Sequence, residues 1–436
     1  MNVSLDAALA EAESRYTAAN PASLARHEAA RSAMPGGNTR TVLHYSPFPL
    51  AWSKGEGATL TDLDGHSYTD YLGEYSAGLY GHSNPKIQAA LKRAIDDGTV
   101  LGGPNVYEAE LAGLLKSRFP SLQALRFCNS GTEANVFALM TAQAHTGRKK
   151  VMVFDGGYHG GVLYFGHGGI PINLPLDWVI APYNDVEGTL GLIRQHGAEL
   201  AAILIEPMLG SGGCLPARQD FLGALRQAAS ELDIILIFDE VMTSRLSSGG
   251  LQAALGVTPD MTTLGKYLGG GSSFGAFGGR ADIMGHYDPE KPGYWPHAGT
   301  FNNNVLSMAA GLTGLRDIYT PEAAMSLNAK GDRLRDGLNA LGEKHGVPFT
   351  ATGVGSFIGI HFTQDVMDRP VHDSAEEEAR QSKIHKLMHL DFIAAGLFFA
   401  RRGYMALSLA LTDRDIDRFV AQTDEFITSR KPLLAA

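Results

Sequence analysis

A single lysine stands in an otherwise uncharged stretch of the sequence. Residues 261–279 read MTTLGKYLGGGSSFGAFGG, and Lys266 is the one charged residue among them. Removal from water disfavours the charged form of an amine, so a lysine in apolar surroundings has a lowered pKa and can form a Schiff base. Because most lysines are solvated surface residues, this interpretation depends on what accompanies Lys266 elsewhere in the chain.

A carboxylate follows the most apolar run of the sequence. Asp239 comes directly after residues 234–238, which read IILIF. In open α/β sheets, ligand groups gather at the carboxyl ends of the strands. A carboxylate at such a position could hold a ring nitrogen protonated. The structural alternative, an N-cap for the turn that follows, is about equally common.

The segment Asn129-Ser-Gly-Thr-Glu-Ala134 lies between an expected strand, 124–128, and an expected helix, 133–146. Small hydroxyl-bearing residues at a helix N-terminus present free amide groups and the positive end of the helix dipole, which suits a phosphate. A plain helix cap formed by Ser130 or Thr132 is the alternative.

Two further loops carry candidate side chains. Tyr158, in Asp155-Gly-Gly-Tyr-His-Gly160, follows the expected strand 150–154. An aromatic ring flanked by glycines can lie flat against a planar cofactor, although a buried core tyrosine is the alternative. His297-Ala-Gly-Thr-Phe301 offers a second hydroxyl, but taken alone it is only a loop before a helix.

These loops require a sheet covered by helices to position them. From about residue 105 helix-like and strand-like segments alternate, and the strands are apolar without alternation, which indicates a mostly parallel sheet buried on both faces. The expected strands are 124–128, 150–154, 201–205 and 234–238, with another ending at 277–278. The expected helices are 108–118, 133–146, 189–195, 221–232 and 304–319.

The two ends of the chain have a different pattern. Residues 1–33 read as helix, and the Asp64-Gly65 pair predicts a hairpin within 49–72. Past residue 325 we expect a long helix at 329–345, strands around 349–362, a polar insertion at 364–383 and a terminal helix at 413–429. We expect a small α+β domain built from both termini, 1–70 and 326–436, and a large domain, 71–325.

Composition excludes several classes of protein. The 436 residues are 44% hydrophobic and 19% charged, with a net charge of −10, so nucleic acid and anionic membranes are poor partners. No apolar run approaches the roughly 20 residues of a membrane span. Two cysteines, Cys128 and Cys214, cannot form a disulfide framework, and the acidic N-terminus is unlike a signal peptide. We expect a cytoplasmic protein without a metal site.

The order of these segments resembles that of the pyridoxal-phosphate (PLP) enzymes of fold type I, and specifically the class-III aminotransferases. NSGTEA, YHG, the strand-end DEV, Lys266 and the loop GTF follow one another as they do in that family, and the resemblance runs from about Pro35 to the C-terminal helix. It implies an α/β fold with a mostly parallel central sheet, pyridoxal 5'-phosphate as cofactor, and a homodimer with shared active sites.

The resemblance assigns roles around the cofactor ring. Lys266 would form the Schiff base and later move the proton between the substrate carbon and the cofactor. Asp239 would pair with the pyridinium nitrogen and keep the ring an electron sink. Tyr158 would stack on one face of the ring, with Val241 or Met242 against the other.

The resemblance also assigns the phosphate contacts. Ser130, Gly131 and Thr132 would hold the phosphate, joined by Thr300 from the neighbouring subunit. Glu206-Pro207 matches a family position near the site, but the sequence gives it no chemical role.

One arginine matches a carboxylate anchor of the family. The block Met34-Pro-Gly-Gly-Asn-Thr-Arg40, with GHSNP and RFCNSGTEAN, looks most like glutamate-1-semialdehyde aminomutase and its relatives. Arg40 falls where that group places a carboxylate-binding arginine, and its planar fork of donors suits bidentate binding. A solvated loop arginine is the alternative.

Two segments depart from the aminomutase. Gly73-Glu-Tyr-Ser-Ala77, with Glu74 and Tyr75, replaces a small polar loop, and the segment 398–408 (FFARRGYMALS) resembles β-amino-acid aminotransferases, which use two arginines in one site. We assign this second role to Arg402, with Arg401 the less favoured candidate, since neighbouring strand residues point to opposite faces. Apolar surface around Tyr75, Ala77, Tyr80, Phe398 and Phe399 would receive an aryl or alkyl group, with core packing as the alternative.

The favoured function is transfer of the amino group of a β-amino acid, such as β-phenylalanine, to 2-oxoglutarate or pyruvate through a pyridoxamine phosphate form. A β-amino acid carries its amine one carbon further from the carboxylate than an α-amino acid does, so one rigid arginine cannot serve both substrates. The alternative is a glutamate-1-semialdehyde 2,1-aminomutase. A third hypothesis, a binding protein that has lost catalysis, is disfavoured because every expected catalytic position is filled.

Overall fold

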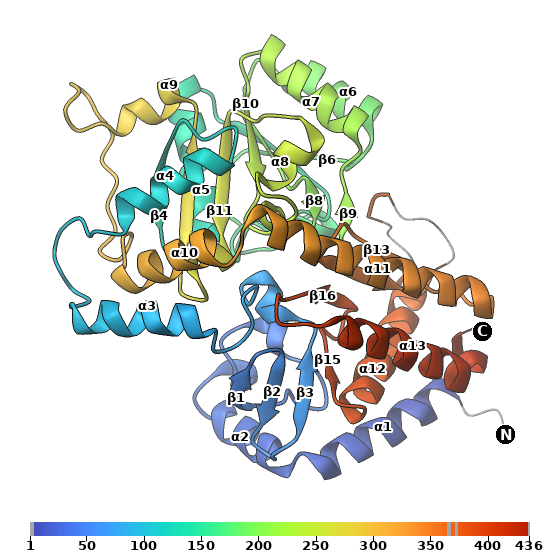
Figure 1. The fold of residues 1–436 in the computed structure, drawn as a ribbon. Coiled ribbons are helices and arrows are strands. Elements are labelled where there is room, and N and C mark those ends of the chain that lie inside the picture. The colour runs from blue at the N-terminus through green and yellow to red at the C-terminus, as the bar shows by residue number, and fades with distance from the viewer. Residues whose placement is uncertain (1–3, 364–367, 371–373, 435–436) are drawn as a thin grey trace.

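A seven-stranded sheet forms the centre of the computed structural model, which describes residues 4–363, 368–370 and 374–434 (Figure 1). In spatial order its strands are β4 (Ala124–Cys128), β12 (Gly275–Gly279), β11 (Met261–Gly265), β10 (Ile235–Asp239), β7 (Leu200–Ile205), β5 (Lys150–Phe154) and β6 (Trp178–Ala181). Strand β12 is antiparallel to both of its neighbours and every other pair is parallel. The expected mostly parallel sheet is confirmed.

Both faces of this sheet are buried under helices. Along β10, Ile235 and Ile237 belong to one hydrophobic cluster, whereas Leu236 and Phe238 belong to another. Successive strand residues point to opposite faces, so an uninterrupted apolar run is what two covered faces require. The helices of this part are α3 (Pro85–Asp96), α4 (Glu108–Arg118), α5 (Gly131–Thr146), α6 (Val186–His196), α7 (Gln219–Glu231), α8 (Gly250–Leu255), α9 (Ala281–Met284) and α10 (Val305–Asp317).

Segments from both ends of the chain lie side by side below the sheet (Figure 1). The N-terminal elements are α1 (Leu5–Ala19), α2 (Pro21–Arg31), β1 (Trp52–Glu56), β2 (Thr59–Asp62) and β3 (Ser67–Asp70). The C-terminal elements are α11 (Pro321–His345), β13 (Thr350–Thr352), β14 (Phe357–His361), α12 (Ala375–Ala394), β15 (Leu397–Phe398), β16 (Tyr404–Ala406) and α13 (Asp413–Leu434). Helix α1 packs against α12, and β15 adds to the N-terminal sheet beside β3.

The C-terminal part differs from expectation in its boundaries. Helix α11 begins at Pro321 rather than at residue 329, because Thr320 caps it by accepting a hydrogen bond from Ala323 at 3.2 Å. Of the predicted polar insertion, 364–367 and 371–373 lie outside the described residues, and 375–383 form the first part of α12. The Asp64-Gly65 hairpin is confirmed by the antiparallel pairing of β2 with β3. No helix among the described residues has the length and apolar character needed to cross a membrane.

Candidate active site

The residues predicted to hold a cofactor converge at one edge of the central sheet. Ser130 follows β4, Tyr158 lies in the loop after β5, Asp239 ends β10, and Lys266 follows β11 directly. Since β4, β5, β10 and β11 run in the same direction, these positions share the carboxyl edge of the sheet, where open α/β sheets bind ligands.

Lys266 begins the short 3-10 turn η6 (Lys266–Gly269) with a left-handed backbone, φ +56°. Its Nζ donates a hydrogen bond to the carbonyl oxygen of Tyr75 at 2.8 Å. Burial lowers the pKa of the Lys266 amine to about 8, and the nearby carboxylates of Asp239 and Glu206 oppose this shift. The amine is therefore more readily available in its neutral, nucleophilic form than that of an ordinary lysine.

A buried network fixes the carboxylate of Asp239. Its Oδ2 accepts hydrogen bonds from Asn135 Nδ2 and His159 Nδ1, both at 2.8 Å, and its Oδ1 accepts from the Val241 amide at 3.0 Å. Asn135 is held in turn because its Oδ1 accepts from the Thr263 hydroxyl at 2.6 Å. These donors stabilise the ionised carboxylate and aim it along one direction.

Asn135 and His159 are functional candidates that the sequence did not reveal. His159 is the histidine of YHG, and Asn135 directly follows NSGTEA. Both side chains are almost completely buried, and both meet Asp239 only because the sheet brings β10 next to α5 and the β5 loop. In the sequence, the only indication of a role was that both residues stand next to a motif. This position did not indicate that they contact Asp239.

Both interpretations of residues 129–134, a helix cap and a phosphate site, apply to the N-terminus of α5. The Ser130 hydroxyl caps the helix by accepting from the Glu133 amide at 3.1 Å, so the cap alternative is correct for this side chain. The amides of Gly131 and Thr132, the first two of the helix, still have no acceptor within the helix and can bind an anion. Gly131 is required here, because a Cβ would lie 2.6 Å from Val241 Cγ1. Thr132 lies against Gly160, where a Cβ would not fit.

Tyr158 is 44% exposed, so the alternative of a buried core tyrosine is wrong. Its amide donates to Glu206 Oε1 at 2.9 Å, and the other oxygen of Glu206 accepts from the Gly210 amide at 3.0 Å. Burial raises the pKa of Glu206 to about 7. Glu206 thus joins the Tyr158 loop to the loop after β7, and the Met242 side chain lies over Gly210 in that second loop.

A strained turn, η3 (Gly73–Ser76), faces Lys266. All four of its residues have positive φ, from +47° to +82°, although only Gly73 adopts this conformation readily. The guanidinium carbons of Arg40 and Arg402 lie 5.6 and 5.8 Å from the centroid of the Tyr75 ring. Glu74 forms an ion pair with Arg40. The turn therefore contacts three cationic side chains at once.

The predicted strand position of Arg401 and Arg402 is wrong. Both residues lie in a turn before β16, closed by Gly403 with φ +83°. They nevertheless diverge: Arg401 donates to the Ser382 hydroxyl at 2.6 Å, and Arg402 donates to the Ser211 hydroxyl at 2.9 Å. The two side chains thus point in different directions as expected, but a turn causes this and not a strand.

Two cavities adjoin the Tyr75 ring. One, of about 560 Å³, is lined by Tyr75, Tyr164, Ser211 and Arg402 among others. The second, of about 270 Å³, is more apolar and is lined by Trp52, Phe398 and Phe399 on the other side. Tyr80 lines neither of them; it is buried against Tyr267 at a ring separation of 6.4 Å, as core packing requires.

Thr300, also a predicted cofactor residue, is exposed in the loop that precedes α10. The loop itself adjoins the Ser130 segment, because Asn129 Nδ2 donates to Asn302 Oδ1 at 3.0 Å. Its predicted contact with the active site of a second subunit stays a prediction.

The side chains fit the chemical groups of PLP. The Lys266 amine, with its lowered pKa, suits the aldehyde of PLP. The carboxylate of Asp239, held by fixed donors, suits the pyridinium nitrogen, and the N-terminus of α5 suits the phosphate. Among the described residues, no group of three or more His, Cys, Asp or Glu could hold a metal ion.

Comparison with known proteins agrees with this geometry. The sequence model of the class-III aminotransferases matches residues 42–165 and 180–424. The chain is 49% identical over 433 residues to the β-phenylalanine transaminase of Variovorax paradoxus, covering 99% of each chain. It is 36% identical over 416 residues to glutamate-1-semialdehyde 2,1-aminomutase of Heliobacterium modesticaldum, covering 91% of this chain and 94% of that one.

A solved structure gives the same result for the fold. The β-phenylalanine aminotransferase from Variovorax paradoxus superimposes with a TM-score of 0.96 at 48% identity, covering 99% of both chains. The sequence match covers most of the chain and includes the residues around Lys266 and Asp239. The chain belongs to the class-III aminotransferases, PLP-dependent enzymes of fold type I.

Proposed function

We propose that this enzyme transfers the amino group of a β-amino acid with an apolar, aryl side chain to 2-oxoglutarate or pyruvate. The observation that carries the proposal is the placement of two guanidinium groups, Arg40 and Arg402, around one ring, Tyr75, beside Lys266. Similarity to a β-phenylalanine transaminase along the full chain supports it.

The roles of the cofactor residues follow from their contacts. Lys266 supplies the neutral amine that holds the cofactor and afterwards carries the proton to and from the substrate carbon. Asp239, fixed by His159 and Asn135, would hold the ring nitrogen of the cofactor in its protonated form. When bound, PLP withdraws electrons from the amine-bearing carbon and so makes its proton removable. The exposed Tyr158 ring is available to stack on the cofactor.

The remaining cofactor contacts are proposed on the same basis. The helix N-terminus at Ser130, Gly131 and Thr132 binds the phosphate through free amides. Val241 lies against Gly131 and Met242 is the next residue, so this pair would cover the second face of the cofactor ring.

Arg402 is favoured over Arg401 as the second carboxylate anchor. The guanidinium groups of Arg40 and Arg402 both lie over the ring of Tyr75, the residue whose carbonyl accepts the hydrogen bond from Lys266. Burial lowers the pKa of Lys266 most, and the positive charges of Arg402 and Arg40 lower it further. Arg401 lines the same cavity of about 560 Å³, but its guanidinium donates to Ser382, whereas the guanidinium of Arg402 lies over the Tyr75 ring. With the amine fixed at the cofactor, the carboxylates of a β-amino acid and of a 2-oxo acid reach different points, and two separate arginines can meet them.

The half-reaction with β-phenylalanine tests the proposal. Addition of β-phenylalanine to the holoenzyme should convert the cofactor absorbance to that of the pyridoxamine form, and 2-oxoglutarate should restore it with formation of glutamate. Absence of a half-reaction with every β-amino acid tried would contradict the proposal. Conversion of glutamate-1-semialdehyde without any oxo acid would instead identify the aminomutase.

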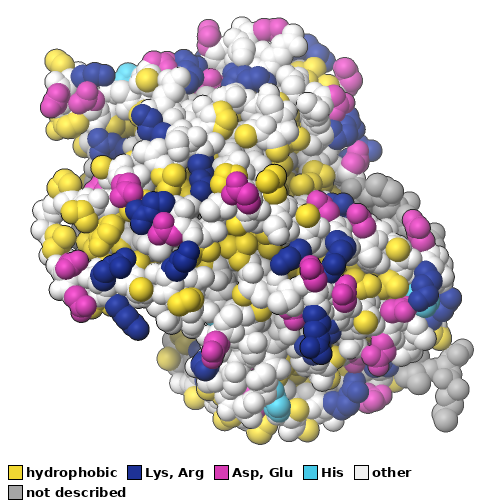
Figure 2. Space-filling model, in the orientation of Figure 1, with side chains coloured by type: hydrophobic (Ala, Val, Ile, Leu, Met, Phe, Trp, Pro, Cys, Tyr) yellow, Lys and Arg dark blue, Asp and Glu magenta, His cyan; other side chains and the backbone are white. Residues whose placement is uncertain are grey.

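We also propose a homodimer with shared active sites. Val100, Leu101 and Val106 are 83%, 56% and 82% exposed in the loop between α3 and α4, where hydrophobic side chains gather on the surface (Figure 2). This loop is joined to the Thr300 loop, since Asn105 Nδ2 donates to the Asn303 carbonyl at 2.8 Å. A second copy that covers the apolar loop would receive Thr300 at its own phosphate site.

Sedimentation tests the dimer. Val106→Asp should yield monomers and weaken cofactor binding, whereas Met325→Asp, at a 67% exposed position on α11, should leave the dimer intact. A wild-type enzyme that sediments as a monomer would contradict the proposal.

The proposal also includes a division into domains and a cellular location. The chain divides into a small domain, 1–70 with 326–436, and a large domain, 71–325; the pairing of β3 with β15 supports this division. A cytoplasmic location is supported by Cys128 and Cys214, which are both free and buried.

A further inference from the structure

Arg245 is a buried cation that the chemistry at Lys266 does not use. It ends the short 3-10 turn η5 (Thr243–Arg245) after β10, and it is 0% exposed. Among the described residues no carboxylate pairs with its guanidinium, and its Nε and Nη1 have no hydrogen-bond partner. Burial of a guanidinium without a counter-ion is costly, so its place in the fold must be explained by the contacts that it does make.

The side chain of Arg245 extends from the loop after β10 into the C-terminal part of the chain. Its Nη2 donates a hydrogen bond to the carbonyl oxygen of Leu407, the residue after β16. Its guanidinium carbon lies 5.0 Å from the centroid of the Phe357 ring, at the start of β14, which is the distance of a cation–π contact. Because β14 pairs with β16, with Phe357 opposite Ala406, this one side chain holds both strands.

Three aromatic rings, Phe357, Tyr404 and Tyr75, continue from this contact to the proposed carboxylate anchors; we call them the ring row. The Phe357 and Tyr404 centroids are 6.2 Å apart with an interplanar angle of 29°, and those of Tyr404 and Tyr75 are 5.7 Å apart with an angle of 13°. The guanidinium carbon of Arg402 lies 5.5 Å from the Tyr404 centroid and 5.8 Å from that of Tyr75. Arg40 contacts the Tyr75 ring as well. The ring row therefore joins the buried cation to both anchors.

The position of Arg402 depends on this row. Arg402 stands in the turn before β16, where its guanidinium donates to the Ser211 hydroxyl at 2.9 Å and lies over the Tyr404 and Tyr75 rings. Tyr404 is the first residue of β16, so a shift of this strand moves both the ring and the turn. Arg245 holds the far end of the strand and the ring against which Tyr404 stacks.

We propose that Arg245 is a positioning residue for substrate carboxylates, because it fixes β16 and the ring row on which the Arg402 guanidinium rests. The inference rests on the proposed function, in which Arg402 is a carboxylate anchor. Arg245 is enclosed by protein and acts through Arg402, not by contact with a substrate. Its loss should therefore weaken the selection of ligands that carry a carboxylate, while the reactivity of the cofactor site toward other amines is retained.

Two probes that differ by a carboxylate test this in the holoenzyme. Aminooxyacetate has two atoms between its nitrogen and its carboxylate carbon, the spacing of a β-amino acid, whereas O-methylhydroxylamine has no carboxylate. Each condenses with the cofactor at its aldehyde carbon, releases the Lys266 amine and forms an oxime that is followed by absorbance. The carboxylate advantage is the ratio of the two second-order rate constants with the enzyme, divided by the same ratio with free PLP.

The carboxylate advantage of the wild-type enzyme should be about tenfold or more, as a charge-assisted hydrogen bond predicts, and Arg402→Gln should remove most of it. Arg245→Met should lower it by about fivefold or more, because a misplaced anchor loses its alignment. Arg245→Lys, which keeps the charge and a donor for the Leu407 carbonyl, should restore part of it. Phe357→Leu, which interrupts the ring row but keeps Arg245, should lower it as Arg245→Met does. The rate with O-methylhydroxylamine should stay within about twofold in all of these variants.

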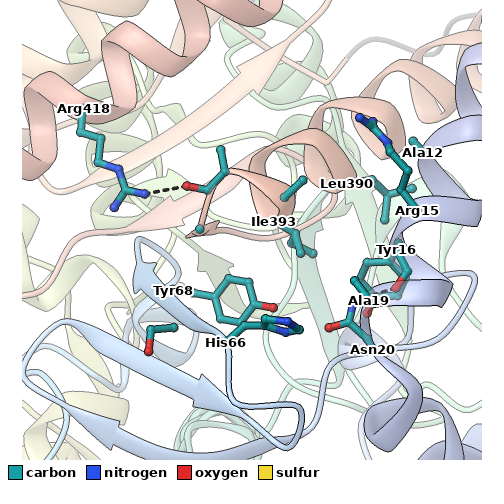
Figure 3. Close-up of a pocket in the computed structure, with 14 residues that line it drawn as sticks. Ala12, Arg15, Tyr16, Ala19, Asn20, His66, Tyr68, Leu390, Ile393 and Arg418 are labelled. Carbon is teal, nitrogen blue, oxygen red and sulfur yellow. Dashed lines mark hydrogen bonds between the residues drawn. The ribbon is translucent and has the colours of Figure 1, made fainter.

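Arg418→Met is the matched control. This exposed arginine also donates to a carbonyl oxygen of the C-terminal part, that of Ala395 at 2.6 Å, as Figure 3 shows. It lines a separate cavity of about 550 Å³, to which neither the ring row nor Arg402 contributes. Its loss should leave the carboxylate advantage unchanged. Thermal melts of every variant accompany the rates.

The outcomes separate this inference from the proposed function. An advantage that Arg402→Gln removes and Arg245→Met leaves intact would overturn the role of Arg245 alone, whatever the melting temperature of that variant. If Arg245→Met yields no folded enzyme, Phe357→Leu decides by the same measure, and an unchanged advantage overturns the proposal. A wild-type advantage near one would overturn both the anchor and this inference. A large advantage that Arg245→Met lowers, without any half-reaction with a β-amino acid, would support the role of Arg245 and contradict the proposed function only.

Discussion

The lowered pKa of Lys266 makes the sharpest prediction, because it sets how much of the amine is reactive at neutral pH. With a pKa of about 8, roughly 10% of the amine is neutral at pH 7, against roughly 0.03% for a lysine of pKa 10.5, a gain of about 300-fold. Burial is the principal cause, so the effect belongs to the folded apoenzyme and disappears on unfolding.

Competitive acetylation of the apoenzyme measures this directly. Only the neutral amine reacts, so labelling of Lys266 should rise about tenfold per pH unit below pH 8 and level off above it. The exposed Lys92 serves as an internal reference in the same digest. Glu206→Gln should move the Lys266 midpoint to lower pH, because the Glu206 carboxylate raises the pKa of the lysine. A midpoint near 10.5 in the folded protein would refute the desolvation argument.

The same pKa fixes the sign of one contribution to stability. The amine binds fewer protons in the folded than in the unfolded state between about pH 8 and 10.5, so its contribution rises with pH across that window and is constant below it. Lys266→Met removes the cost of desolvating the charge. It should therefore stabilise the apoenzyme more at pH 7 than at pH 10.5, as measured by urea denaturation.

Three further predictions concern the neighbours of this amine. His159→Leu should lower kcat more than it raises KM, because Asp239 loses a donor that orients its carboxylate while the substrate contacts stay intact; a change in KM alone would contradict this role. Gly131→Ala should destabilise the fold by about 1–3 kcal/mol and weaken PLP binding, since the new Cβ meets Val241, whereas Gly103→Ala, with open space around it, should do neither in thermal melts and cofactor titrations. Tyr75→Phe should retain activity while Tyr75→Leu raises KM for both substrates, because the ring holds both arginines; equal kinetics of the two variants would count against that contact.

The strands of the large sheet could be predicted from the sequence because each strand is marked by residues within and next to it. Uninterrupted apolar runs such as residues 234–238 identify strands buried on both faces, and turn residues mark their ends. The loops of Ser130, Tyr158 and Asp239 were recognisable because their residue types stand at strand ends. The antiparallel direction of β12 left no such signal, since its five residues, GAFGG, carry no information about orientation.

The contacts that complete the site come from distant segments and could not be read from the chain. The donors of His159 and Asn135 to Asp239, and of Lys266 to the Tyr75 carbonyl, depend on tertiary packing. The four positive φ values at Gly73–Ser76 also went unpredicted, because three of these residues are not glycine. Backbone strain of this kind persists only where the surrounding structure imposes it.

The pairing of β15 with β3 has a consequence for biosynthesis. The Thr69 amide donates a hydrogen bond to the Gly396 carbonyl. The edge strand β3 of the N-terminal sheet can therefore be paired with β15 only after almost the entire chain has been synthesised. Until then β3 presents unpaired backbone groups, which are a route to aggregation. Arg40 emerges early from the ribosome and Arg402 late, and both meet at Tyr75 only after this strand has docked. A nascent chain can therefore contain every strand of the large sheet while it still lacks Arg402, one of the two arginines proposed to hold carboxylates. Substrate selectivity thus depends on a segment that is synthesised late.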